Sequence, residues 1–267
     1  MPSIPYLDYD AATDTFEEKS CTAFSTVTSD TTTFEDDGWY VVDRDVVMTG
    51  HNIVVDGAAH LILCDGASLT ISGLANNLAG IQVGSGNALT IYGQTAGSGA
   101  LTVTGGKYGA AIGGNYGCAN GAITINGGNL SMTGGSGASG IGTGYLPSGT
   151  CDQITINGGT VVASSIDSTG AAGIGTGRGA EGGGYTGGDI LITGGKVSAL
   201  ARGGSADIGG GDYCTGGNIR IAGGTYLGSG GRASLGGGQR NCVCLWGSES
   251  PNWWFGGSEN GKICGIR

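Results

Sequence analysis

Ile123-Thr-Ile-Asn-Gly-Gly128 is the stretch of this sequence that decides the fold, because close variants of it return further along the chain. The variants are Ile154-Thr-Ile-Asn-Gly-Gly159, Ile190-Leu-Ile-Thr-Gly-Gly195 and Ile219-Arg-Ile-Ala-Gly-Gly224. A second motif, one aliphatic residue among glycines, recurs at spacings of 29, 33, 34 and 27 residues, at Ile112, Ile141, Ile174, Ile208 and Leu235. Recurrence at about thirty residues indicates a repeat protein in which each unit stacks on the next.

A unit of this length cannot enclose a core by itself, so its apolar residues must be buried between neighbouring units. In Ile-Thr-Ile, the alternation of a strand sends both isoleucines inward and the threonine outward. Each unit is therefore expected to form one coil of three short strands joined by glycine-rich corners. Asn126 and Asn157 take the same turn position in neighbouring coils, where their side-chain amides can hydrogen-bond to each other.

These patterns predict an all-β fold: a single-stranded right-handed parallel β-helix of about seven coils. The β-helix is expected over residues 39–240. Residues 1–38 are expected to form an acidic N-terminal extension or cap. Residues 241–267, rich in cysteine and tryptophan, are expected to form a C-terminal cap stapled by disulfides.

Composition and charge argue against several classes of protein. The 61 glycines occur with only four prolines and without a three-residue period, which argues against collagen. Hydrophobic residues make up 39% of the chain, which argues against disorder. The net charge is −10, and residues 1–45 hold eleven acidic against two basic residues. The sequence has no stripe of basic residues that could bind phosphate groups, so nucleic acid is not expected as a partner.

The longer motifs resemble a known group of sequences. Gly38-Trp-Tyr-Val-Val, His60-Leu-Ile-Leu-Cys-Asp-Gly, Leu89-Thr-Ile-Tyr-Gly-Gln and the repeated Ile-Thr-Ile-Asn-Gly-Gly look like glycine-rich repeat regions of large surface and secreted proteins of gut Firmicutes and related bacteria. The Ile-Asn-Gly-Gly pattern is also similar to a clostridial cellulose- and polygalacturonate-binding β-helix, a non-catalytic relative in shape of pectate lyases. That resemblance implies carbohydrate binding, with calcium as the one cofactor to consider.

Eight cysteines, an even number without zinc-type spacing, favour disulfides and hence a secreted or cell-surface protein. Cys118 and Cys151 fall on successive coils and are expected to bridge them. Cys214 is expected to pair with Cys242 or Cys244, which leaves the other for Cys264. Cys64 is either a buried free thiol or the partner of Cys21. The chain has no apolar run of eighteen residues, so no membrane span is expected.

Aromatic residues are the candidates for carbohydrate binding, because their rings stack on the apolar faces of sugars. Five tyrosines recur beside the glycine-flanked aliphatic residues and could line one side of the β-helix: Tyr108, Tyr116, Tyr145, Tyr185 and Tyr213. Trp253 and Trp254 lie in the C-terminal segment, where they either stack on pyranose rings or plug the open end of the β-helix.

Asp207 and Asp212 are the best candidates for catalytic carboxylates or calcium ligands, with a solvated loop charge as the default interpretation. The expected function is that of a non-catalytic module that binds a polysaccharide or a glycoprotein glycan, or acts as an adhesin. One alternative is a structural subunit that stacks head to tail into filaments, because the N-terminal segment is acidic and the C-terminal half slightly basic. The other alternative is a polysaccharide lyase or glycoside hydrolase.

Overall fold

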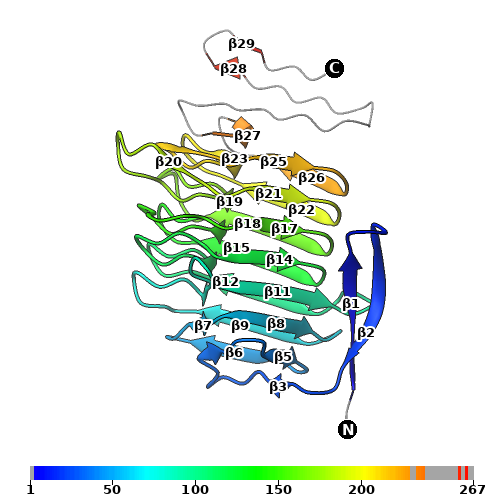
Figure 1. Ribbon diagram of the computed structural model, residues 1–267. Helices are drawn as coiled ribbons and strands as arrows, with labels where there is room; N and C mark the ends of the chain where they lie inside the picture. Colours follow the sequence, from blue (N-terminus) through cyan, green and yellow to red (C-terminus); the bar gives the residue numbers. More distant parts are fainter. Residues whose placement is uncertain (1–2, 229–232, 238–257, 260–261, 264–267) are drawn as a thin grey trace.

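The computed structural model describes residues 3–228, 233–237, 258–259 and 262–263 (Figure 1). These residues form strands, turns and loops, and none of them lies in a helix. Within them, therefore, no helix is present that could span a membrane. The strands build an elongated stack of coils, with the N-terminal residues at one end and alongside the stack (Figure 1).

Three parallel sheets run the length of the stack, and each coil contributes one strand to each sheet in turn. The first sheet contains β3 (Ser25–Thr26), β5 (Trp39–Val42), β8 (Ala58–Leu63), β11 (Ala88–Gly93), β14 (Ala122–Ile125), β17 (Ile154–Ile156), β21 (Ile190–Ile192) and β25 (Ile219–Ile221). The second sheet contains β6 (Val46–Thr49), β9 (Ser68–Ser72), β12 (Ala100–Thr104), β15 (Asn129–Gly134), β18 (Thr160–Ser165), β22 (Lys196–Leu200) and β26 (Thr225–Gly228).

The third sheet is the narrowest, because five of its eight strands are only two residues long, and three of these are Ile-Gly pairs. It contains β4 (Thr33–Phe34), β7 (Ile53–Val55), β10 (Ile81–Gln82), β13 (Ile112–Gly113), β16 (Ile141–Gly142), β19 (Ile174–Gly175), β23 (Ala206–Gly209) and β27 (Ala233–Gly236). Short strand pairs lie outside these sheets: β20 (Tyr185–Thr186) with β24 (Cys214–Thr215), and β28 (Ser258–Glu259) with β29 (Lys262–Ile263).

The predicted all-β parallel β-helix is confirmed. Ile123 pairs with Ile154, Ile154 with Ile190, and Ile190 with Ile219, so the four isoleucines form one column. The seven strands of the second sheet are joined by six steps from coil to coil. The solenoid thus has about six turns, slightly fewer than the about seven coils expected from the sequence.

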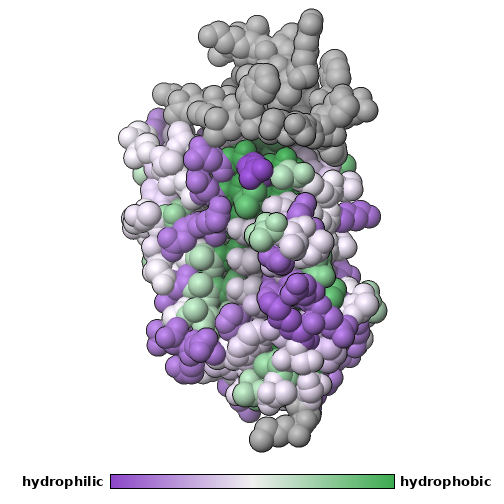
Figure 2. Space-filling model, turned by 45° about the vertical axis from the view of Figure 1, so that its right-hand side comes forward, coloured by the Kyte–Doolittle hydropathy of each residue, from purple (hydrophilic) through white to green (hydrophobic). Residues whose placement is uncertain are grey.

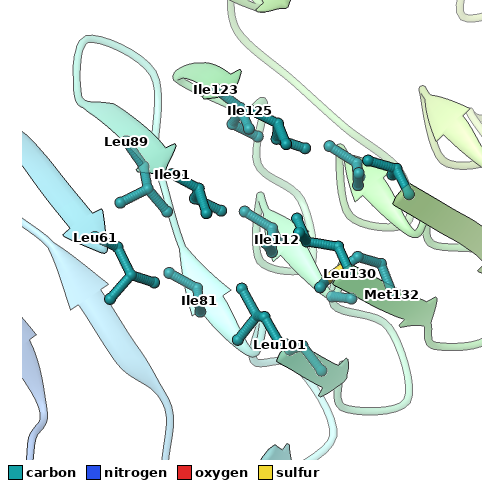
Figure 3. Close-up of a cluster of buried hydrophobic side chains, with 14 of the residues drawn as sticks. Leu61, Ile81, Leu89, Ile91, Leu101, Ile112, Ile123, Ile125, Leu130 and Met132 are labelled. Atoms are coloured by element: carbon teal, nitrogen blue, oxygen red, sulfur yellow. The ribbon is translucent and has the colours of Figure 1, made fainter. Parts of the chain in front are cut away.

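The core is a continuous apolar column enclosed by the three sheets. Inward-facing residues from all three sheets meet there, among them Leu89, Ile112 and Leu130, each at most 1% exposed (Figure 3). Because the same positions recur in every coil, each side chain packs on its equivalent above and below. On the face shown in Figure 2, strongly hydrophobic colour is confined to small areas, the clearest just below the grey atoms.

Glycines of the third sheet allow the coils to approach closely. Gly113, Gly142, Gly175 and Gly209 follow the paired isoleucines, and their φ angles lie between 125° and 131°. A β-carbon on Gly142 would lie 1.9 Å from the carbonyl oxygen of Gly175 in the next coil. Both the backbone angle and the lack of space therefore require glycine at these positions.

A ladder of polar side chains follows the corner after the first sheet. The Asn157 amide donates to Asn126 Oδ1 at 2.9 Å, which confirms the predicted pairing of stacked amides. Thr193 Oγ1 donates to Asn157 Oδ1 at 2.8 Å, and Asn126 Nδ2 donates to Asp8 Oδ1 at 3.1 Å. The ladder thus satisfies buried amides across three coils and ends on the N-terminal segment.

The acidic N-terminal segment has two parts. Residues 25–34 form the first partial coil, where the fully buried Val27 and Phe34 close the lower end of the core. Before it, β1 (Ile4–Asp10) and β2 (Thr15–Cys21) form an antiparallel hairpin that lies across the outside of the coils (Figure 1). The Tyr6 ring packs 5.0 Å from the Trp39 ring and 4.8 Å from the Tyr92 ring, so the hairpin is held by aromatic contacts.

Replacement of one glycine in the third sheet tests whether the close approach of neighbouring coils requires glycine. Gly142→Ala should lower the free energy of unfolding by about 2–5 kcal/mol, because overpacking costs about 1–3 and a positive φ at a residue with a β-carbon about 1–2 kcal/mol. Urea unfolding followed by circular dichroism measures the change. Gly84→Ala is the matched control, since a β-carbon there meets its nearest neighbour, Asn87 Nδ2, at 3.8 Å. Equal stability of the two variants would contradict the close approach.

Candidate functional site

Three of the five predicted tyrosines form one aromatic cluster on the loops that flank the third sheet. The ring centroids of Tyr108, Tyr116 and Tyr145 lie 5.4 to 6.0 Å apart, and the Tyr108 and Tyr145 rings are stacked. Tyr116 is 41% exposed, and the Lys107 ammonium lies 5.0 Å from the centre of the Tyr108 ring. The cluster therefore presents aromatic surface to solvent beside a single positive charge.

The register of the third sheet places two of these tyrosines in a longer column. Ile112, Ile141, Ile174 and Ile208 pair in succession. The residues four positions after them are Tyr116, Tyr145, Arg178 and Asp212. We call these four residues the axial stripe, since they lie on successive coils along the axis of the solenoid.

Backbone hydrogen bonds hold the axial stripe in register beyond the ends of the strands. Gly117 N donates to the Tyr145 carbonyl at 2.9 Å, Leu146 N to the Arg178 carbonyl at 2.8 Å, and Gly179 N to the Asp212 carbonyl at 2.9 Å. The stripe residues thus continue the parallel pairing of the sheet, although the loops around them differ in length.

The upper half of the axial stripe is polar. Arg178 Nε lies 3.7 Å from Asp212 Oδ2, and the side chains of Arg178 and Asp212 are 33% and 16% exposed. The Arg178 guanidinium also lies 5.3 Å from the centre of the Tyr213 ring. Tyr213, another of the five predicted tyrosines, therefore contacts the axial stripe through this cation–π interaction.

Two residues beside the axial stripe have a backbone conformation that side chains rarely adopt. Leu146 has a φ of 52° and Tyr213 a φ of 62°, and each directly follows a stripe residue. Such strain outside glycine persists only where the surrounding structure enforces it, and it concentrates at functional sites. Two other residues with positive φ, Asp14 and Asp37, lie in the N-terminal segment, and aspartate adopts this conformation more readily than leucine or tyrosine.

Tyr185 lies in a different environment from the other tyrosines. It pairs with Cys214 through β20 and β24, and its hydroxyl lies 3.2 Å from Cys151 Sγ. Burial raises the pKa of the Tyr185 hydroxyl, and the hydrogen bond with Cys151 raises it further. Tyr185 therefore serves the packing of the thiol-bearing loops, and we leave it out of the aromatic cluster.

The predicted disulfide between Cys118 and Cys151 is wrong, because both cysteines are free thiols. Cys118 lies five residues before Ile123 and Cys151 three residues before its partner Ile154, so they are two positions out of step. Cys151 instead faces Tyr185.

The other described cysteines, Cys21, Cys64 and Cys214, are also free thiols. Of the two alternatives for Cys64, the structure therefore shows the free thiol, which is partly buried. The other predicted disulfide partners, Cys242, Cys244 and Cys264, lie outside the described residues, and so do Trp253 and Trp254. The stapled cap and the alternatives for the tryptophans stay predictions.

Asp207 is a core residue of the last described coils. It is fully buried, and its Oδ1 accepts a hydrogen bond from the Ala201 amide at 2.7 Å. Burial raises the pKa of Tyr226, and the nearby negative charge of Asp207 raises it further. The sheet register shows that Asp207 replaces Gly173 and that Tyr226 replaces Val197. The two polar residues therefore face each other at core positions that are apolar or glycine in the coil below.

Asp207 and Asp212 have separate partners, since Asp212 lies beside Arg178. In the part of the chain that the structure describes, no three histidine, cysteine, aspartate or glutamate side chains are grouped for a metal ion. The calcium site suggested by these two aspartates stays a prediction without a supporting arrangement.

A shallow hollow adjoins the aromatic end of the axial stripe. It has a volume of about 230 Å³, and its lining includes Asn115, Gly117 and Ser148. A second open hollow of about 490 Å³ lies among Cys151, Asp152 and Asp189. Both are open depressions, which suit a ligand that lies along the surface.

Fold and site together define a parallel β-helix repeat protein with an aromatic and polar stripe on its loops. No family model matches the chain, and no curated protein or solved structure is significantly similar to it.

Thiol reactivity tests the environments of the cysteines. Burial raises the pKa of Cys214 to about 11, so less than about 1% of it is thiolate at pH 8. Cys118 is exposed. Iodoacetamide at pH 8, followed by peptide mapping, should label Cys118 at least tenfold faster than Cys214. Equal labelling rates, or a mapped peptide that links Cys118 to Cys151, would contradict the described geometry.

Proposed function

We propose that this protein is a secreted or cell-surface module that binds glycans without catalysis, as a receptor for polysaccharide or as an adhesin. The observation that carries the proposal is the cluster of Tyr108, Tyr116 and Tyr145, with its exposed ring at Tyr116. Tyrosine rings stack on the apolar faces of sugars while their hydroxyls remain available for hydrogen bonds. A polysaccharide or a glycoprotein glycan is the class of ligand that such a surface suits.

The shape of the protein supports the same proposal. The coils repeat at a fixed rise, so the loops beside the third sheet form a long surface. Solenoids use extended surfaces of this kind for binding. The register fixes the positions of the aromatic residues before any ligand arrives, which lowers the entropy that binding costs.

The enzymatic alternative loses support from the carboxylates on which it depended. Glycoside hydrolysis needs two carboxyl groups that flank the scissile bond. Asp207 is fully buried in the core, and the Asp212 side chain lies beside Arg178. Asp207 therefore cannot reach a polysaccharide on the surface.

The filament alternative loses part of its electrostatic argument. It relied on an acidic N-terminal end that attracts a basic end of the next copy. The hairpin of β1 and β2 carries Asp8, Asp10 and Glu17 along the side of the solenoid instead (Figure 1). Much of the acidic charge is thus away from the end where a second copy would stack.

A glycan array with purified protein tests the proposal, together with affinity electrophoresis in gels that contain polysaccharide. Retention on defined glycans is expected, and assays for reducing ends and unsaturated products should show no turnover. Tyr116→Ala should weaken binding about two- to twelvefold, since one stacked ring contributes about 0.5–1.5 kcal/mol.

Phe16→Ala is the matched control, because Phe16 is 40% exposed on the hairpin, close to the value for Tyr116. It should leave glycan binding unchanged. An array without any retained glycan would reject the proposed function, and turnover of a polysaccharide would favour the enzymatic alternative.

A further inference from the structure

We infer that the axial stripe is a row of subsites for a linear, uncharged glycan that lies parallel to the solenoid axis, with one sugar ring on each coil. The inference rests on the proposed glycan-binding function and adds the class of glycan, its direction and the residues that select it. Arg178 and Asp212 join the tyrosines as binding residues.

The distance between successive stripe residues indicates that the ligand lies parallel to the solenoid axis. Tyr116, Tyr145, Arg178 and Asp212 lie on four successive coils, and the backbone hydrogen bonds between those coils fix their order. Neighbouring strands of a parallel sheet are about 4.8 Å apart. The Tyr116 and Tyr145 ring centroids are 6.0 Å apart. A step of this size is close to the length of one pyranose unit in an extended chain, so successive sugars meet successive stripe residues.

The change of chemistry along the stripe gives the two ends different roles. At the tyrosine end, rings can stack on sugar faces, and the adjoining hollow is lined by the polar residues Asn115 and Ser148. At the other end, Arg178 offers donors and Asp212 offers acceptors, which suits the hydroxyl groups of a sugar. Arg178 Nε and Asp212 Oδ2 lie 3.7 Å apart, which exceeds the length of a hydrogen bond. Because Arg178 Nε and Asp212 Oδ1 are buried, a sugar would use the other polar atoms of these two side chains, which are 33% and 16% exposed.

Charge favours an uncharged glycan. The positive charge of Arg178 is balanced by Asp212 in the same stripe. The protein as a whole carries a net charge of −10, which repels an anionic polymer at long range. Lys107 leaves one positive charge beside Tyr108, too little to compensate for a carboxylate on every sugar.

The strained backbone beside the stripe agrees with this role. Leu146 and Tyr213, with φ angles of 52° and 62°, directly follow Tyr145 and Asp212, so the backbone changes direction immediately after these two partly buried stripe residues. A site held in this way needs little rearrangement on binding.

The experiment is a chain-length series. Isothermal titration calorimetry of the full chain would use β-1,4-linked oligosaccharides of glucose, xylose and mannose from two to six units, with the matching galacturonate series as the anionic probe. For at least one uncharged series, affinity should rise about fivefold per unit up to four units and then level off, since each subsite adds about 1 kcal/mol.

Variants locate the subsites. Arg178→Ala should weaken the four-unit ligand about fivefold, the contribution of one subsite of about 1 kcal/mol, and leave the two-unit ligand unchanged, whereas Tyr116→Ala should weaken both ligands. Arg178→Gln, which keeps most of the side-chain size, repeats the test if the alanine variant is unstable. Arg220→Ala is the control, because Arg220 is exposed on β25 of the first sheet.

Failure of this inference can be distinguished from failure of the proposed function. If the array retains glycans but no uncharged series binds, or affinity does not depend on length, the row of subsites is rejected and glycan binding stands. Tighter binding of the galacturonate series would also reject it. If no glycan binds in either experiment, the proposed function itself fails.

Discussion

The register between successive coils is the constraint on which the rest of this structure depends. Each coil must place its strands directly over those of the coil before, so that backbone groups pair and isoleucines stack. The Ile-Gly strands of the third sheet allow this, because Gly142 and its equivalents have no β-carbon to meet the next carbonyl oxygen. Without these glycines the coils would be forced apart, and both the core and the hydrogen bonds would be lost.

The same register produces the surface that we connect with glycans. A loop may change length from coil to coil, but the fourth residue after the paired isoleucine stays in one column. That position holds Tyr116, Tyr145, Arg178 and Asp212 in turn. Differences in sequence between repeats therefore change the side chains along one axis of the solenoid, from two neighbouring aromatic rings to an ion pair.

Features that repeat could be predicted from the sequence, because the period itself carries the information. The isoleucine column, the pairing of Asn126 with Asn157 and the contact between Tyr116 and Tyr145 all follow from equivalent positions in successive units. The Cys118–Cys151 disulfide failed for a related reason, since both cysteines were placed by their loop and not by their distance from Ile123 and Ile154. Counting residues from the isoleucines would have revealed the offset, and also the column that includes Arg178.

Features without a period could not be predicted in this way. The hairpin of β1 and β2 packs on Trp39 and Tyr92 through Tyr6, and no repeat specifies which face of the solenoid such a segment should cover. Asp207 was treated as a surface charge, because nothing in its neighbourhood indicated that Tyr226 would accompany it inside the core. The position of the hairpin and the burial of Asp207 both depend on contacts that are not repeated from coil to coil.

The most direct test of the register is cross-linking of engineered cysteines on the second sheet. Thr102 pairs with Ser131 in the next coil, so Thr102→Cys with Ser131→Cys should form a disulfide under mild oxidation. Thr102→Cys with Thr133→Cys, displaced by one pleat, should not, because Thr133 pairs with Thr104. Peptide mapping identifies the bond formed. Cross-linking of the displaced pair in preference to the paired one would contradict the stacking of coils from which the fold and the site both follow.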